Sequence, residues 1–396
     1  MNIAIITDSF PPMMDGVSKC ALGYAETLAE RGDNCIVVAP QVPKANYDYP
    51  FPVYYYPSIG LPYAEYRAGH PFIPNLAAKL KRMNIDILHV HSPFTAMTIA
   101  RQLRYWLKIP IVFTQHTKWD FDIARAVSSK ILQKNILRYA YANIAAVDEV
   151  WAVSRGAGEY LVDHGFKGDF IVMPNGTDFV QSLVNPKDLA KLDKQFGLSD
   201  EVPTLLFVGR MMMYKGIGLI IDALEILRNR GFEFRMIFVG DGEDLEEAKR
   251  LTTRKSLDNA VHFAGRINDR EALKAYYTRA ELFLFPSVYD TAGLVVTEAA
   301  ACFCPSVVIC GSAAAETLDD GVTGFHIEET SESLADCVQN AFADRAKLER
   351  VALAAANEVY LPWNKVMERS IKRYEIVKKS YDKKRRERKR RSIFRI

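Results

Sequence analysis

Residues 282–301 read LFLFPSVYDTAGLVVTEAAA, and this stretch shows the unit from which the fold is built. The apolar run at 282–285 predicts a strand that is buried on both faces. Pro286 ends that run, and a polar loop that contains Asp290 follows it. The small and apolar residues after Gly293 favour a helix. Strand, loop and helix in this order are the repeating unit of a parallel α/β sheet.

The same unit recurs along the whole chain in two series. The first series predicts a helix at 18–31 and strands at 3–7, 35–39, 87–90, 111–114, 149–153 and 170–173. A turn signal stands at 174–176, and the pattern then restarts with strands at 204–208, 234–239, 261–263, 282–285, 306–309 and 324–327. We therefore expect an α/β protein with two facing doubly wound parallel-sheet (Rossmann-like) domains and a cleft between them.

The domain boundaries follow from that restart. We expect an N-terminal domain at 1–174 and a C-terminal domain at 175–361. A final helix at about 362–380 is expected to complete the first domain, and a polybasic tail occupies 381–396.

Composition narrows the class of protein. The chain has 396 residues, of which 49% are apolar and 25% are charged, as in an ordinary soluble globular protein. It has no run of eighteen apolar residues, and its first residues lack the features of a signal peptide, so we expect a cytoplasmic protein. The six cysteines and seven histidines show no metal-ligand spacing, which predicts buried thiols and no metal site.

The charge is unevenly distributed. Residues 378–396 hold eleven Lys or Arg against two acidic residues, a local charge of +9, whereas the whole chain carries +3. Such a tail is typical of a solvated helix end, a nucleic-acid patch or an anchor on anionic lipid. Apolar residues at 393, 394 and 396 favour the lipid surface, and no nucleic-acid motif accompanies the tail.

The loop after residue 285 carries the strongest chemical signal. Asp290 lies in the loop and Glu298 lies in the following helix, while the amides of Ala292, Gly293 and Leu294 form a helix N-terminus that can bind an anion. One carboxylate can accept sugar hydroxyls and the other ribose hydroxyls. The alternative is an aspartate that caps the helix and a glutamate that faces solvent.

A second motif, which carries positive charge, follows the strand at 204–208. Gly209 and Arg210 end the strand, and Lys215 precedes the next helix. The forked donors of arginine and the point charge of lysine suit a diphosphate, although a surface pair would show the same pattern. Gly240 ends the next strand in the same way.

Three residues of the first series lie in loops that follow strands or at strand ends. Gly16 opens the first helix and allows a phosphate to approach the backbone, although the dinucleotide fingerprint is absent. His91 and His116 end neighbouring strands, where a histidine is either structural or part of a site.

Together these motifs resemble the family 4 retaining glycosyltransferases, which have two Rossmann-like domains in the GT-B architecture. The resemblance runs from residue 1 to about 375. It rests on Gly16, His91, His116, residues 174–178, Gly209 and Arg210 with Lys215 and Gly216, residues 240–242, Asp290 and Glu298 with Gly293 and Leu294 between them, and residues 311–325.

The resemblance implies a role for each site residue. Arg210 and Lys215 would hold the donor diphosphate with Gly16, Gly209, Gly240 and the amides of residues 292–294. Glu298 would bind ribose, Asp290 the transferred sugar, and His116 would lie beside that sugar. The catalytic set would be His116, Asp290, Arg210 and Lys215, with His91 and Lys118 on the acceptor side. The family needs neither a metal nor another cofactor.

The resemblance also implies partners. The N-terminal domain would bind the acceptor and the C-terminal domain a nucleotide-diphosphate sugar. The stretch 114–120 and Asp290-Thr291 are similar to bacterial diacylglycerol glucosyltransferases. We therefore expect transfer of glucose from a UDP-sugar to a membrane lipid such as diacylglycerol, at the inner face of the plasma membrane, with residues 378–396 on the anionic surface.

Two other functions stay open. One is a glycosyltransferase of cell-wall or capsular polysaccharide assembly with a sugar acceptor, and the other is a nucleotide-sugar epimerase. The family's usual first glutamate is Asp290 here, one methylene shorter, which leaves the choice of donor sugar open.

Overall fold

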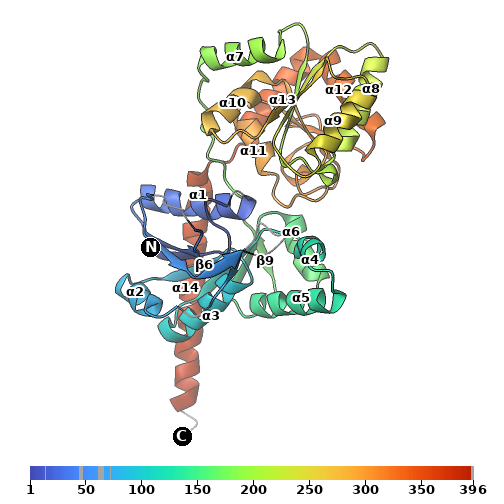
Figure 1. Ribbon diagram of the computed structural model, residues 1–396. Coiled ribbons are helices and arrows are strands. Elements are labelled where there is room, and N and C mark those ends of the chain that lie inside the picture. Colours follow the sequence, from blue (N-terminus) through green and yellow to red (C-terminus); the bar gives the residue numbers. More distant parts are fainter. Residues whose placement is uncertain (14, 44–47, 61–66, 72, 394–396) are drawn as a thin grey trace. The chain divides into compact units, whose positions relative to one another are not determined.

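A computed structural model describes residues 1–13, 15–43, 48–60, 67–71 and 73–393 (Figure 1). Two compact units divide these residues. Unit 1 consists of Met1–Gly176 together with Trp363–Ile396, and unit 2 consists of Thr177–Pro362. Each unit has its own sheet and its own buried apolar core.

Unit 1 is built on a parallel sheet in the order β3-β2-β1-β6-β7-β8-β9. The strands are β1 (Asn2–Ile6), β2 (Asn34–Pro40), β3 (Val53–Tyr56), β6 (Ile87–Val90), β7 (Ile111–Gln115), β8 (Glu149–Ala152) and β9 (Phe170–Val172). The inner strands are largely buried and apolar, because helices cover both faces of a parallel sheet. The strand order changes direction at β1, and ligands bind at such switch points in open α/β sheets.

The helices of unit 1 connect these strands. They are α1 (Gly16–Glu30), α2 (Leu76–Arg82), α3 (Thr95–Leu107), α4 (Trp119–Ala126), α5 (Lys130–Ile144) and α6 (Arg155–Asp163). A small antiparallel pair, β4 (Ser58–Gly60) and β5 (Arg67–Gly69), was not expected from the sequence. Helices α4 and α5 are separate, because Val127 leaves the helical conformation between them.

The last helix, α14 (Trp363–Ile393), belongs to unit 1 and packs against α1. Buried aromatic and polar contacts hold it there. Tyr374 bonds to His89 Nδ1 at 2.6 Å and stacks on Trp151, with ring centroids 5.0 Å apart. Ser370 lies 3.2 Å from the hydroxyl of Tyr24 on α1. Helix α14 therefore completes the buried core of unit 1.

Unit 2 contains a second parallel sheet, in the order β12-β11-β10-β13-β14-β15. The strands are β10 (Thr204–Val208), β11 (Arg235–Val239), β12 (Val261–Gly265), β13 (Leu282–Phe285), β14 (Ser306–Ile309) and β15 (Phe325–Ile327). The prediction of two doubly wound parallel sheets is thus confirmed.

The helices of unit 2 lie on both faces of its sheet. They are α7 (Pro186–Phe196), α8 (Ile217–Asn229), α9 (Leu245–Arg254), α10 (Arg270–Arg279), α11 (Leu294–Ala301), α12 (Ser331–Ala343) and α13 (Arg345–Glu358), with 3-10 turns η1 (Met213–Lys215) and η2 (Ala315–Thr317). None of the helices in the described part of the chain combines the length and the apolar character needed to cross a lipid bilayer.

The close packing of α1 on α14 gives a first prediction. A Cβ atom at Gly23 would lie 2.3 Å from Cε2 of Trp363, whose ring also contacts Tyr24. Gly23→Ala should therefore lower the free energy of unfolding by about 1–3 kcal/mol, because overpacking outweighs the better helix propensity of alanine.

Thermal unfolding of the purified protein checks this prediction. The matched control is Gly218→Ala in α8, where the new Cβ would meet only Met213 Sδ at 3.9 Å. That variant should be as stable as the wild type or slightly more stable. A Gly23→Ala protein that is as stable as the control would contradict the tight packing of α14.

Candidate active site

The predicted residues of unit 2 gather at the carboxyl ends of its strands. Gly209 and Arg210 follow β10, and Gly240 follows β11. The Gly209 amide donates to Val239 O at 3.0 Å, and a Cβ at Gly240 would lie 1.8 Å from Gly209 O. Gly240 has a φ of +143°, so only glycine fits this close approach of two strand ends.

Lys215 and Asp290 form the central ion pair of this group. Lys215 Nζ donates to both carboxylate oxygens of Asp290, at 2.8 and 2.9 Å, and Ser287 Oγ donates to Oδ2 at 2.6 Å. Burial raises the pKa of Asp290, but the charge and hydrogen bonds of Lys215, the bond from Ser287 and the charge of Arg210 outweigh it and lower the pKa overall. Asp290 is therefore ionised and holds the lysine cation in place.

The backbone brings these two loops together. Gly216 has a φ of +81°, and a Cβ there would lie 2.2 Å from Pro286 O. The turn η1, which carries Lys215, can therefore lie directly on the loop that carries Asp290. The side chain of Lys215 keeps 13% of its surface exposed, so an anion can reach it.

The helix α11 begins as expected but its glutamate is not exposed. Gly293, with a φ of +55°, is the N-cap, and no side chain of the described residues makes a capping hydrogen bond there. Glu298 is 4% exposed and accepts from Arg270 Nη2 at 2.7 Å and from Tyr277 Oη at 3.1 Å. The alternative of a capping aspartate and a solvated glutamate is therefore wrong.

Arg270 joins Glu298 to Asp178 in a charged network. Burial lowers the pKa of Arg270, but the two carboxylates outweigh this and raise the pKa above its usual value. Burial and the nearby Glu298 raise the pKa of Tyr277. Glu298 is thus fixed in one orientation by two donors.

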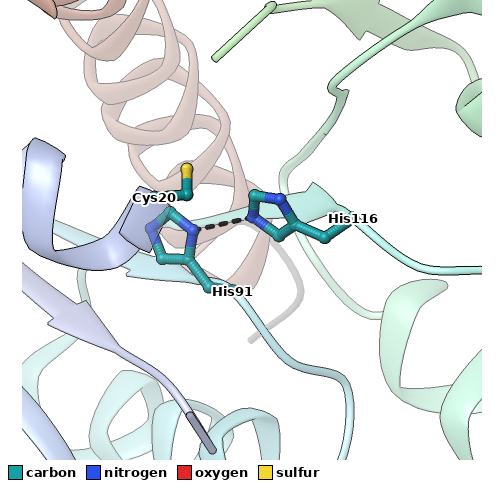
Figure 2. A group of neighbouring side chains, drawn as sticks. All are labelled: Cys20, His91 and His116. Atoms are coloured by element: carbon teal, nitrogen blue, oxygen red, sulfur yellow. Dashed lines mark hydrogen bonds between the residues drawn. The ribbon is translucent and has the colours of Figure 1, made fainter. Parts of the chain in front are cut away.

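The predicted residues of unit 1 lie at the carboxyl ends of β6 and β7. His91 Nδ1 and His116 Nε2 are 2.9 Å apart, and Cys20 of α1 lies beside them (Figure 2). Burial lowers the pKa of His116 to about 3 and holds that of His91 well below its usual range, so both rings are neutral near pH 7.

The structure divides the predicted residues between the two units. Gly16, His91, His116 and Lys118 lie in unit 1, and the other predicted residues lie in unit 2. Gly16 is the exposed first residue of α1, which Asp15 caps through the amide of Ser18 at 2.8 Å. Lys118 is half-buried at the start of α4.

Several residues of these groups were missed by the sequence analysis. Ser287 stands three residues before Asp290, a spacing that could have indicated it. Arg270 and Tyr277 come from another helix and carry no local signal. Asp8 stands two residues after the end of β1, and this position near a strand end could have been noticed.

Two family descriptions match the chain. "Glycosyltransferase Family 4" matches residues 14–181, and "Glycosyl transferases group 1" matches residues 189–358. The chain belongs to the GT-B glycosyltransferases. The resemblance found from the sequence motifs is thereby confirmed, and this glycosyltransferase carries the family 4 domain largely in unit 1 and the group 1 domain in unit 2.

Individual relatives differ in what they act on. An alpha-monoglucosyldiacylglycerol synthase of Streptococcus pneumoniae is 22% identical over 78% of this chain and 70% of its own. A phosphatidyl-myo-inositol mannosyltransferase of Mycobacterium leprae is 27% identical over 97% of this chain and 99% of its own. Anabaena HepE, solved in complex with UDP-glucose, is 20% identical with a TM-score of 0.73 and covers 95% of this chain and 99% of its own, which shows the shared fold.

Asp8 gives a prediction that depends on pH. Its Oδ1 accepts from Tyr56 Oη at 2.7 Å and from the Ala96 amide at 2.8 Å, while its buried Oδ2 has no partner among the described residues. Burial raises the pKa of Asp8 from 3.8 to about 6, although these hydrogen bonds oppose the shift. The folded state therefore binds a proton more tightly than the unfolded state.

The contribution of Asp8 to stability is full below its unfolded pKa and is lost as pH rises through about 6. Asp8→Asn removes this loss, because an amide does not ionise. At pH 7.5 the free energy of unfolding of the variant should therefore exceed that of the wild type by up to about 3 kcal/mol. At pH 4.5 most of this advantage should be gone. Unfolding temperatures of both proteins at the two pH values test this, and an unchanged difference would contradict the shifted pKa.

Proposed function

We propose that this glycosyltransferase moves glucose from UDP-glucose to a membrane lipid such as diacylglycerol, with retention of configuration and without a metal ion. The observation that carries the donor half is the Lys215–Asp290 pair, a cation and a carboxylate at the strand ends of unit 2. The acceptor half draws on the relative named alpha-monoglucosyldiacylglycerol synthase and on the basic end of α14.

In this proposal unit 2 binds the donor. Arg210 and Lys215 hold the diphosphate, since a guanidinium fork and an ammonium suit phosphate oxygens. Gly209, Gly240 and the amides of residues 292–294 let the diphosphate approach the backbone. Glu298 accepts hydroxyls of the ribose, and Asp290 accepts hydroxyls of the transferred sugar. In the free protein Lys215 donates to Asp290, and a bound phosphate would accept hydrogen bonds from the same ammonium group.

The reaction exchanges one bond at the anomeric carbon for another. The acceptor oxygen attacks from the face that the diphosphate leaves, so the configuration is retained. The bond from C1 to the diphosphate oxygen breaks, and the leaving oxygen takes the proton of the acceptor hydroxyl. Lys215 and Arg210 offset the charge that develops on the diphosphate, an electrostatic contribution already in place before the reaction.

Unit 1 serves the acceptor in this proposal. The strand ends of this unit carry His91 after β6 and His116 after β7, and Lys118 follows His116. Both histidines are neutral near pH 7. A neutral imidazole can accept a hydrogen bond from an acceptor hydroxyl, which an imidazolium cannot.

The membrane contact uses the end of α14 and its neighbour α3. Arg104 of α3 lies over the ring of Tyr381, 5.4 Å from its centroid, so the two helices meet there. Tyr105 and Trp106, at the end of α3, are 70% and 71% exposed. Aromatic rings beside basic residues suit the surface of an anionic bilayer. Residues 394–396, which the sequence analysis included in this anchor, lie outside the described residues.

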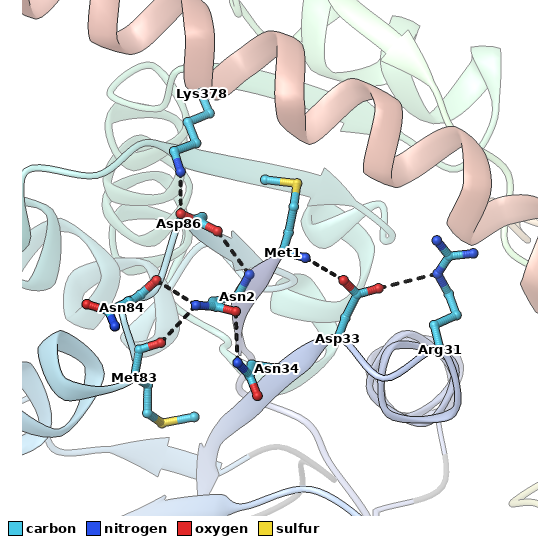
Figure 3. A network of polar contacts seen from close by, with 9 residues as sticks. All are labelled: Met1, Asn2, Arg31, Asp33, Asn34, Met83, Asn84, Asp86 and Lys378. Atoms are coloured by element: carbon cyan, nitrogen blue, oxygen red, sulfur yellow. Dashed lines mark hydrogen bonds and ion pairs between the residues drawn. The ribbon is translucent and has the colours of Figure 1, made fainter.

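We propose that the protein is cytoplasmic and associates peripherally with the inner face of the plasma membrane through residues 378–396. At their start, Lys378 pairs with Asp86, which accepts from the Asn2 amide at 3.0 Å (Figure 3). This contact ties the base of the basic segment to the sheet of unit 1.

An acceptor screen with radiolabelled UDP-glucose tests the proposed function. Diacylglycerol in anionic vesicles is offered beside free sugars, and the product is extracted into organic solvent. Label in the organic phase is the expected result. Label only in water-soluble sugar products would overturn the lipid acceptor and favour polysaccharide assembly, and conversion of the donor without any acceptor would favour an epimerase.

The role of Lys215 gives a separate prediction. Lys215→Ala should lower the rate of transfer by a factor on the order of 100 or more, because it removes the cation opposite the leaving diphosphate. Steady-state rates with saturating acceptor measure this. Lys249→Ala is the matched control, because this exposed lysine pairs with Glu246 on the surface of α9. Activity of Lys215→Ala near that of the control would contradict the assignment.

The basic segment gives another prediction. Deleting residues 383–396 should release the protein from vesicles rich in anionic lipid and leave hydrolysis of the donor unchanged, since both Lys378 and Tyr381 remain. Vesicle sedimentation measures the binding. Replacing the Lys and Arg residues at 383–391 by Gln keeps the chain length and should have the same effect. Full binding by both variants would refute the electrostatic anchor.

A further inference from the structure

Cys20, His91 and His116 form a compact cluster whose chemistry the transfer reaction does not use. Cys20 lies in the second turn of α1, and the two histidines follow β6 and β7. One possible ligand atom from each residue lies within 4.8 Å of the other two. We propose that these three side chains bind a soft transition-metal ion of the Zn²⁺ class, a site beyond the proposed transfer function.

The donor set determines the class of ion. A thiolate with two imidazoles suits Zn²⁺, Co²⁺ or Cu⁺, whereas Mg²⁺ and Ca²⁺ require oxygen ligands. The facing nitrogens, His91 Nδ1 and His116 Nε2, can both be directed at one ion. Three protein ligands leave a fourth position for water, as in open zinc sites.

The present distances need only small changes to fit such an ion. Two imidazole nitrogens on one tetrahedral Zn²⁺ stand about 3.4 Å apart, and a sulfur and a nitrogen about 3.6 Å apart. His91 Nδ1 and His116 Nε2 are 2.9 Å apart, so this pair opens by about half an ångström. The sulfur has to approach by up to about 1 Å. Figure 2 shows the thiol beside the two rings, whose facing nitrogens are joined by the dashed line.

The surroundings of His91 are compatible with binding through Nδ1. His91 is 2% exposed, and its Nε2, the nitrogen that does not face His116, has no hydrogen-bond partner among the described residues. Nε2 can therefore carry the ring proton while Nδ1 offers its lone pair to an ion. Cys20 is fully buried and donates to Asn175 Oδ1 at 3.0 Å, which holds its sulfur on this side of α1. His116 is the most exposed of the three residues, at 7%, so an ion can enter the cluster beside its ring.

Cobalt(II) binding tests the site without any enzymatic assay. The protein is used with Cys310→Ser, because Cys310 is the exposed cysteine among the described residues and would bind metal adventitiously. Co²⁺ should bind with a stoichiometry near one per chain and give the charge-transfer absorption of a cobalt thiolate. Cys20→Ser should abolish that absorption, and His91→Ala should weaken binding by about tenfold or more.

The matched control is Cys35→Ser, which removes another buried thiol of unit 1 and should leave the absorption unchanged. Cys20→Ala repeats the test if Cys20→Ser does not fold, as judged by circular dichroism. Failure of the parent protein to bind Co²⁺ stoichiometrically would overturn the site. Absorption that survives in Cys20→Ser or Cys20→Ala would overturn it as well.

A second measurement rests on the proposed function. Because His116 belongs to the proposed catalytic set, an ion bound to it should inhibit transfer. Zn²⁺ should inhibit the parent protein reversibly, a chelator should restore the rate, and Cys20→Ser should resist inhibition. Equal inhibition of both proteins would contradict the site. A protein without transferase activity under any condition would overturn the proposed function and leave the cobalt result standing.

Discussion

Parallel strand pairing is the constraint on which the rest of the structure depends. Because every strand of both main sheets runs in one direction, all carboxyl ends of a sheet meet at one edge. Residues far apart in the chain, such as Gly209, Gly240 and Asp290, are thereby collected in one place. The apolar strands need only be buried on both faces, so the loops at that edge are free to carry charge.

The charged groups at that edge are arranged so that each is held by another. Lys215 is held by Asp290, and Glu298 is held by Arg270 and Tyr277. A buried carboxylate that is held by neutral donors is protonated more readily, as is illustrated by Asp8, which accepts from Tyr56 and the Ala96 amide and has a raised pKa. An ion pair at a partly exposed position keeps both charges present and oriented until a phosphate competes for the lysine. The histidines of unit 1 differ from these ion pairs, because burial lowers their pKa and keeps them uncharged.

The sequence predicted the two parallel sheets because buried strands are continuous apolar runs, and it predicted the start of α11 because Gly293 punctuates it. Its motifs placed Lys215 after the strand at 204–208 and Asp290 after the strand at 282–285. The ion pair itself could not be predicted, since it depends on the contact between Gly216 and Pro286, 70 residues apart. The burial of Glu298 depends on Arg270 from another helix, and the cluster of Cys20 with two histidines joins three elements without sequential spacing. Tertiary contacts of this kind leave no local signal.

The central claim is that Lys215 binds phosphate and that Asp290 holds it in readiness. Calorimetric titration of UDP into two variants tests this most directly, because UDP lacks the sugar that Asp290 would contact. Lys215→Ala should weaken UDP binding by about tenfold or more, a loss of at least about 1.4 kcal/mol. Asp290→Asn should bind UDP as tightly as the wild type or more tightly, because the lysine is released from its carboxylate. Equal losses in both variants would mean that the pair is a structural bridge, and would contradict the account.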